Sequence, residues 1–270
     1  MKIAFTTLAC PEWDLDEIIA RAREYGYDGV DFRGYRGQMD LCKLPEFAPS
    51  AAAAAARKLA DAGLTVACLS SSVRLCQPDE EGLAAAIEEV RRYAELCGIF
   101  AARFVRVFGG AVGDASRGDA VEMAVAGLDK LARAAHPAIL AVETHDAWVD
   151  TSLLAELFRR TDAPNVCALW DVHHPYRLHG ESPQESWRNI GRYTRYTHVK
   201  DSRRRPDGEF DYCLPGEGDV PLAEIVSLLQ ADGHCDYLTL EWEKLWHPEI
   251  AEPEVALPAY AAYLRRLIGP

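Results

Sequence analysis

Four residues with metal-binding side chains stand at or near the ends of four successive strand-like runs in the second half of the chain: Glu143, Asp171, His198 and Glu241. An apolar strand normally ends in a turn residue, so this repetition indicates a shared site. Two Glu, one Asp and one His supply mostly oxygen ligands with one nitrogen. Such a set suits a divalent cation such as Mn²⁺, Mg²⁺ or Co²⁺. The pattern predicts a metal centre.

The elements that must position these residues alternate along the whole chain, and each strand-like run is followed by a run with helical spacing. We expect strands near residues 2–6, 28–33, 64–70, 103–108, 138–143, 166–171, 196–200 and 237–242. We expect helices near residues 14–25, 47–62, 80–97, 119–134, 150–160, 183–191, 221–231 and 253–268. Eight strand–helix pairs without a compositional break over residues 1–270 predict one α/β domain, a single (β/α)8 TIM barrel.

A barrel explains how four distant residues can form one site. The carboxyl ends of its parallel strands surround one mouth, where active sites form. The four residues lie on strands five to eight, so their side chains can converge on one ion. A doubly wound sheet is the main alternative, but residues 7–13, the first strand-to-helix connection, lack the Gly-rich fingerprint of its dinucleotide-binding form. We prefer the barrel.

The composition restricts the class of protein further. Apolar residues make up 49% of the 270 residues, which is enough for one large core. The net charge of −13 argues against binding to nucleic acid or to an anionic membrane. A few arginines could still hold a small anionic substrate. No basic segment followed by an apolar run opens the chain, and no apolar run could span a bilayer, so we expect a cytoplasmic location.

Five short motifs surround the four residues or follow them. They are Val-Glu-Thr-His-Asp at 142–146, Trp-Asp-Val-His-His at 170–174, Thr-His-Val-Lys-Asp at 197–201, Gly-Glu-Gly-Asp at 216–219 and Leu-Glu-Trp-Glu-Lys at 240–244. These motifs resemble the xylose isomerase-like TIM-barrel superfamily. The resemblance is strongest to its sugar-phosphate isomerase/epimerase branch, which includes tagatose 3-epimerase-like and inosose-processing enzymes. It extends over nearly the whole chain.

The resemblance implies a role for several residues. It implies that one divalent metal ion, Mn²⁺, Mg²⁺, Co²⁺ or Zn²⁺, is bound by Glu143, Asp171, His198 and Glu241. It implies substrate contacts by His174, three residues after Asp171, and by Arg204, six residues after His198. Arginines also flank Arg204 on both sides, and a one-residue difference in the loop would move the role to a neighbour. The adjacent His173 and His174 cannot both face the site in regular backbone, so one of them is expected to be structural.

Two residues beside the expected ligands have alternative roles. Lys200 shares strand parity with His198, so both can point into the barrel. It either neutralises a substrate oxyanion or pairs with a ligand carboxylate. Glu243 shares parity with Glu241, and the family pattern favours Glu241 as the ligand.

Two arginines in the first half of the chain are expected near the mouth. Arg33 ends the second strand, and Arg106 lies inside the fourth. A charge within a barrel strand is costly unless it is paired or directed at the mouth. Arg106 therefore either contacts an anionic or hydroxyl-rich substrate or forms a structural ion pair with Asp31 or Glu143.

The ligand set and the resemblance predict an enzyme of carbohydrate metabolism, a divalent-metal-dependent isomerase or epimerase of a sugar or keto-sugar. The metal binds a substrate carbonyl and its neighbouring hydroxyl and stabilises the enediolate that forms when the α-proton leaves. Glu143 and Glu241 lie on opposite sides of the ion, so one can remove the proton and the other can return it. Return to the opposite face gives epimerisation, and return to the adjacent carbon gives isomerisation. His174 and Arg204 hold substrate oxygens.

Other outcomes stay open. Expulsion of a β-hydroxyl or glycosidic oxygen after the same proton abstraction would make the protein a metal-dependent lyase or dehydratase of a keto-sugar or inosose. A barrel that binds metal or sugar without catalysis has no need for two proton-transfer carboxylates. The abasic-site nucleases of this superfamily need histidines after strands two to four, and this chain has none before His136. The identity of the sugar, its phosphorylation and the oligomeric state, including a homo-oligomer, are not fixed by the sequence.

Overall fold

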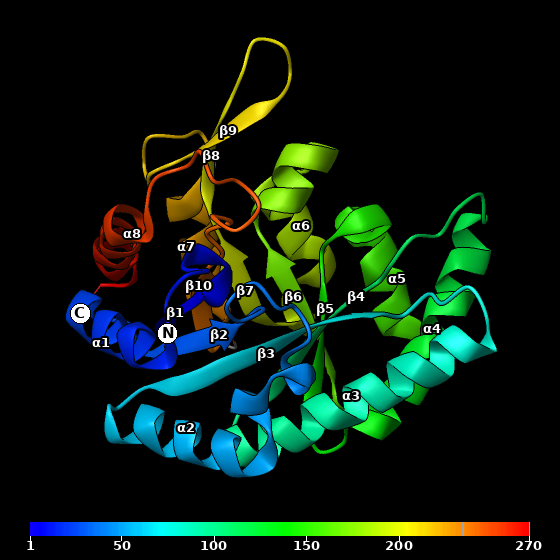
Figure 1. The fold of residues 1–270 in the computed structure, drawn as a ribbon. Helices are drawn as coiled ribbons and strands as arrows, with labels where there is room; N and C mark the ends of the chain where they lie inside the picture. The colour runs from blue at the N-terminus through cyan, green and yellow to red at the C-terminus, as the bar shows by residue number, and fades with distance from the viewer. Residues whose placement is uncertain (234, 270) are drawn as a thin grey trace.

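The computed structural model describes residues 1–233 and 235–269, which form a closed barrel of eight parallel strands with α-helices around it (Figure 1). The barrel strands are β1 (Lys2–Thr6), β2 (Gly29–Phe32), β3 (Thr65–Arg74), β4 (Phe104–Phe108), β5 (Ile139–Glu143), β6 (Val166–Asp171), β7 (Thr194–Val199) and β10 (Tyr237–Leu240). The helices are α1 (Leu15–Tyr25), α2 (Pro49–Asp61), α3 (Glu80–Phe100), α4 (Arg117–Ala135), α5 (Thr151–Arg160), α6 (Pro183–Ile190), α7 (Leu222–Asp232) and α8 (Pro253–Ile268).

The strands follow chain order around the barrel, and β1 closes it by pairing with β10. The register pairs Phe5 with Leu240 and Asp171 with His198, so the carboxyl ends of distant segments lie level at one mouth. This topology confirms the predicted (β/α)8 TIM barrel. None of the described helices is long and apolar enough to cross a membrane.

Local sequence signals set the helix boundaries. The Asp14 carboxylate accepts a hydrogen bond from the backbone N–H of Glu17 at 2.9 Å, and Gly26 ends the same helix, α1, at a φ of 78°. Asp79 and Ser116 cap α3 and α4 with the same type of bond. Each cap satisfies an N–H group that the start of a helix leaves unpaired. These caps explain why the predicted boundaries lie close to the observed ones.

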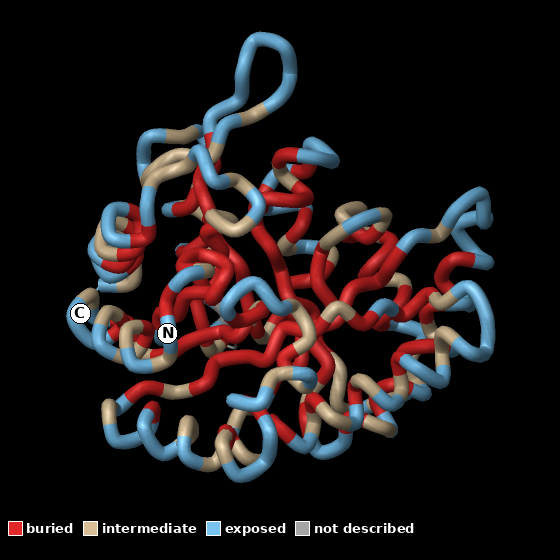
Figure 2. The backbone as a smooth tube through the Cα atoms, in the orientation of Figure 1, coloured by how far each residue is buried: buried red, intermediate tan, exposed pale blue. Residues whose placement is uncertain are grey.

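Apolar side chains form one layer between strands and helices and a smaller cluster inside the barrel. Figure 2 shows the buried backbone running along the strands, with exposed residues on the outer helix faces. The inner cluster mixes small residues with aromatic rings such as Phe104 and Tyr196, whose centroids are 5.4 Å apart. This packing fills the barrel interior, so the polar strand ends form the bottom of the mouth.

One element was not predicted. A two-stranded antiparallel hairpin, β8 (Asp201–Arg204) and β9 (Phe210–Cys213), follows β7 and extends away from the barrel, in yellow in Figure 1. The strand expected to reach residue 200 ends at Val199, because the chain enters this hairpin. Strand β3 is longer than expected and continues to Arg74.

Candidate active site

The four expected metal ligands lie together at the carboxyl ends of β5, β6, β7 and β10. One ligand atom from each lies within 4.8 Å of the others, and all four residues are buried: Glu143, Asp171, His198 and Glu241. Divalent cations lie about 2.0–2.6 Å from their ligands, so atoms on opposite sides of one ion are about 4–5 Å apart. The cluster therefore has the dimensions of a site for one ion.

His198 lies between the two glutamates of this cluster. Its Nδ1 is 3.3 Å from Oε1 of Glu143 and 3.2 Å from Oε1 of Glu241. Burial lowers the pKa of His198, but the surrounding carboxylates outweigh burial and raise this pKa well above its ordinary value. Burial raises the pKa of Glu143, whereas the charges of Arg106 and His198 lower it to about 2. The site thus strongly favours positive charge among its carboxylates.

The other imidazole nitrogen of His198 contacts Asp31, a residue for which the sequence suggested only an ion pair with Arg106. Oδ2 of Asp31 is 3.2 Å from Nε2 of His198 and 3.1 Å from the Tyr196 hydroxyl, which donates to it. The Ser70 hydroxyl donates to Oδ1 of Asp31 at 2.7 Å. A fixed carboxylate on Nε2 orients the ring and leaves Nδ1 for a cation.

The ammonium group of Lys200 contacts three carboxylates of the site. Its fully buried Nζ is 2.7 Å from Oδ2 of Asp171, 2.5 Å from Oε2 of Glu241 and 2.9 Å from Oε1 of Glu243. Burial lowers the pKa of Lys200, yet these carboxylates raise it well above its ordinary value, so the ammonium stays charged. This is the geometry of a carboxylate partner, one of the two roles expected for Lys200. Glu243 also accepts a hydrogen bond from the Tyr212 hydroxyl at 3.0 Å.

The donor set fits a divalent ion. Within residues 1–233 and 235–269, the buried carboxylates of the site outnumber the cations that contact them, Arg106 and Lys200. Oε2 of Glu143 is buried without a hydrogen-bond partner, although Nε of Arg106 lies 3.3 Å from it. Buried charge is stable only when it is compensated, so a cation with oxygen and nitrogen ligands suits this cluster.

The cluster opens into a cavity of about 340 Å³ at the barrel mouth. Glu143 and Glu241 line this cavity, whereas Asp171 and His198 are not among its lining residues. The aromatic rings of Phe108 and Trp246 form apolar parts of the wall. Two of the four candidate ligands therefore also face the space that a substrate would occupy.

The adjacent histidines have different environments. His174 lines the cavity, and its Nδ1 is 2.9 Å from the carbonyl oxygen of Thr144, which leaves Nε2 for a ligand. His173 is fully buried with Nε2 2.9 Å from the Ser202 hydroxyl, and it is not among the residues that line the cavity. The structure thus separates one cavity-facing histidine from one structural histidine.

Arg204 lies outside the cavity. It ends β8, and its guanidinium donates to the carbonyl oxygens of Gly208 and Arg177, each at 3.1 Å. Neither Arg204 nor the arginines on either side of it line the cavity. The hairpin geometry places the side chain of Arg204 against backbone carbonyls, and a substrate contact by Arg204 stays a prediction.

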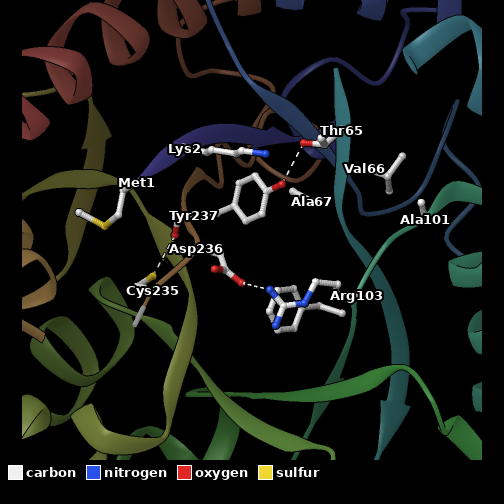
Figure 3. A pocket seen from close by; sticks show the side chains of 11 residues that line it. Met1, Lys2, Thr65, Val66, Ala67, Ala101, Arg103, Cys235, Asp236 and Tyr237 are labelled. Carbon is white, nitrogen blue, oxygen red and sulfur yellow. Dashed lines mark hydrogen bonds and ion pairs between the residues drawn. The ribbon is translucent and has the colours of Figure 1, made fainter. Parts of the chain in front are cut away.

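A larger cavity, of about 520 Å³, lies at the opposite end of the barrel (Figure 3). Arg103 and Asp236 form an ion pair there at 2.7 Å, and the Tyr237 and Thr65 hydroxyls are 2.9 Å apart. None of the four clustered ligands lines this cavity. Because active sites of such barrels form at the carboxyl ends of the strands, the smaller mouth cavity is the candidate site.

The sequence matches a family model described as xylose isomerase-like TIM barrel over residues 19–267. The chain therefore belongs to this family. A comparison with curated proteins found no match.

Solved structures share the fold over nearly the full chain. The IOLI protein, solved with a zinc atom, is 20% identical with a TM-score of 0.82, over 99% of this chain and 98% of that one. D-psicose 3-epimerase, solved with D-fructose, is 14% identical with a TM-score of 0.80 over both whole chains. The probable 3-DHS dehydratase AsbF of Bacillus anthracis, involved in petrobactin synthesis, is 20% identical with a TM-score of 0.79 over 98% of each chain. At these identities the likeness shows the fold alone.

Proposed function

We propose that the protein is a divalent-metal-dependent isomerase or epimerase that acts on a sugar or keto-sugar. The observation that carries this proposal is the placement of Glu143 and Glu241, which belong to the ligand cluster and also line the cavity. Removal and return of a proton need two groups of this kind beside one substrate. Membership in the xylose isomerase-like family supports the same reaction class.

The ion would be held by Glu143, Asp171, His198 and Glu241. This donor set suits Mn²⁺, Mg²⁺, Co²⁺ or Zn²⁺. When bound, the ion supplies Lewis-acid polarisation of a carbonyl and its neighbouring hydroxyl.

The chain's own residues provide the proton transfer. Each glutamate presents Oε1 to His198 and keeps Oε2 near a cation, Arg106 for Glu143 and Lys200 for Glu241. Oε2 of one glutamate removes the proton next to the carbonyl. The other glutamate delivers to the substrate a proton that it has taken from solvent, and the first then releases its proton to solvent. Delivery to the opposite face gives epimerisation, whereas delivery to the neighbouring carbon gives isomerisation. His174, which lines the cavity with Nε2 available, would hold a substrate oxygen and stabilise the negative charge that develops on it.

A metal-dependent lyase or dehydratase of a keto-sugar or inosose is the second candidate. His145 supports it, because this imidazole lines the cavity with its ring centroid 5.0 Å from that of His174. An acid at that position could protonate a departing β-hydroxyl after the same proton abstraction. Product analysis separates the two reactions, since only elimination yields an unsaturated product.

Metal removal tests the proposed function. Protein stripped with a chelator should bind about one equivalent of Mn²⁺ per chain, as expected for one cluster of ligands. With Mn²⁺, the protein should exchange the α-proton of at least one member of a panel of ketoses and keto-sugars in D₂O, measured by NMR. The chelated protein should show no exchange. Protein that binds no divalent ion on addition would overturn the proposal.

Replacement of Asp31 tests the orientation of His198. In Asp31→Asn the amide oxygen can accept from Ser70 or from Tyr196, which donate to different oxygens of the carboxylate, and the charge opposite Nε2 of His198 is lost. Mn²⁺ affinity should fall about 10–100-fold, the usual cost of losing such a partner. The measurement is a competition titration against a fluorescent chelator. Asp236→Asn at the other end of the barrel is the control, and equal affinities of the two variants would contradict the role of Asp31.

A further inference from the structure

We infer that the substrate carries an anionic group, a carboxylate or a phosphate, which binds to Arg33 and Arg106 on the wall of the mouth formed by the ends of β2 and β4. The inference rests on the proposed function, because it takes the mouth cavity as the substrate site. Both arginines line that cavity, and Arg74 lines it as well. Arg74 and Arg106 lie on β3 and β4 and Arg33 directly follows β2, whereas the clustered acidic residues lie on β5 and β6 and directly after β10.

Arg106 has two donor nitrogens without a hydrogen-bond partner among the described residues, and one of them, Nε, forms an ion pair with Glu143. The residue is 1% exposed, and its Nε and Nη1 are buried without a hydrogen-bond partner. Its guanidinium carbon lies 3.9 Å from the centroid of the Phe108 ring, which fixes the plane of the group. Its ion-pair partner is Glu143, a residue already engaged with His198. Buried guanidinium donors are normally all satisfied, so the free donor Nη1 is available to a bound acceptor.

Arg33 adds a second cation at the same wall. Its Nη1 donates to the Ser72 hydroxyl at 2.9 Å, and among the described residues it forms no ion pair. Its guanidinium carbon lies 5.7 Å from the centroid of the same Phe108 ring that Arg106 covers. Burial and then the neighbouring charge of Arg106 lower the pKa of Arg33 to about 9. The charges of the two arginines repel each other, and an anion bound to both would relieve this repulsion.

The two arginines give the substrate an orientation. A carbonyl and its adjacent hydroxyl would lie at Glu143 and Glu241, while an anionic end would lie beside them, at Arg33 and the free donor of Arg106. A planar guanidinium binds carboxylate or phosphate through paired hydrogen bonds, which a neutral hydroxyl cannot match. A substrate with hydroxyl groups alone would leave Arg33 without an anionic partner and the free donor of Arg106 without a charged acceptor.

Matched polyols test this inference directly. D-glucitol is neutral, D-gluconate replaces one terminal carbon by a carboxylate, and D-glucitol 6-phosphate carries a phosphate at the other end. Their binding to Mn²⁺-supplemented protein is measured by calorimetry or ligand-observed NMR. At least one anion should bind about ten-fold or more tightly than D-glucitol, as expected for hydrogen bonds to a charged acceptor. The anion with the higher affinity identifies the group.

Variants show whether the arginines cause the preference. Arg33→Gln should remove most of it, and Arg106→Lys, which keeps the charge but loses the forked donors, should weaken it. Arg103→Gln is the control, because Arg103 lies before β4 at the opposite end of the barrel (Figure 3). Thermal unfolding followed by circular dichroism checks that each variant is folded. If the anion bound to the metal instead, Arg33→Gln and Arg106→Lys would keep the preference, and the inference would be wrong.

The remaining outcomes separate this inference from the proposed function. Equal affinity for D-glucitol and both anions, or no binding of either anion to protein that binds Mn²⁺ normally, would overturn the anionic substrate. If ketoses exchange their α-proton in such protein, the proposed function still stands. Arginine-dependent anion binding without exchange in any ketose or keto-sugar would support the anion site and contradict the isomerase.

Discussion

Replacement of Glu143 or Glu241 by Gln should abolish exchange of the substrate α-proton with solvent deuterium and leave the fold intact. Glutamine has the shape of glutamate and keeps one oxygen for a cation, but its amide cannot accept the proton. Loss of a general base typically costs about 10²–10⁴-fold in rate. Each variant should therefore fall to near background in an NMR assay in D₂O. Undiminished exchange in both variants would exclude the two-glutamate mechanism.

Two further substitutions make the result specific. Glu243→Gln changes a carboxylate that shares Lys200 with Glu241 but bonds to Tyr212 instead of approaching His198. It should reduce exchange much less than Glu241→Gln, and the reverse order would make Glu243 the reactive residue. Glu254→Gln, on the exposed start of α8, should have no effect. A Mn²⁺ titration of every variant separates loss of the base from loss of the ion.

The order of strands and helices was predictable because local signals mark each boundary. The hairpin β8–β9 was missed, since its short charged strand 201–204 lacks the apolar alternation of a barrel strand. A signal for it is nevertheless present. The sequence Arg-Pro-Asp-Gly-Glu at 205–209 is typical of a tight turn, and Gly208 adopts a φ of 95° there. The same hairpin explains why the side chain of Arg204 lies away from the cavity.

The candidate ligands were predictable because each one ends an apolar run, and Lys200 and Arg106 were among the expected partners of their carboxylates, but Asp31 was not an expected partner of His198. Asp31 meets His198 across the barrel although 167 positions separate them in the chain. The contact forms because the sheet closes into a barrel, and no local sequence pattern predicts it. An ion pair with Glu143 was one of the alternatives expected for Arg106. The two residues lie on the neighbouring strands β4 and β5. Alternation along a strand predicts which side chains point into the barrel. It does not predict how close to the mouth each one lies, and this decides which residues line the cavity.

Replacement of Lys200 by Met should lower the free energy of unfolding of the metal-free protein by about 3–5 kcal/mol, the usual cost of removing one partner from a buried ion pair. Lys200 is fully buried and compensates the charges of Asp171, Glu241 and Glu243. Methionine fills a similar volume without a charge. Urea unfolding in the presence of a chelator measures the loss. Lys58→Met, which breaks an exposed pair with Asp16, is the control and should have a far smaller effect.

The loss of stability in Lys200→Met should depend on pH and on metal. Burial alone raises the pKa of Glu241, but Lys200 and His198 together hold it well below its ordinary value. Without the ammonium, burial dominates, and the folded protein holds a proton on a carboxylate that the unfolded chain releases. The deficit should therefore grow as the pH rises and shrink as it falls. Mn²⁺ should stabilise the variant more than the wild type, because a bound cation compensates the same carboxylates. The contrary result is that Lys200→Met loses no more unfolding free energy than Lys58→Met, with a loss that changes neither with pH nor with Mn²⁺. That result would show that Lys200 does not stabilise the carboxylate cluster.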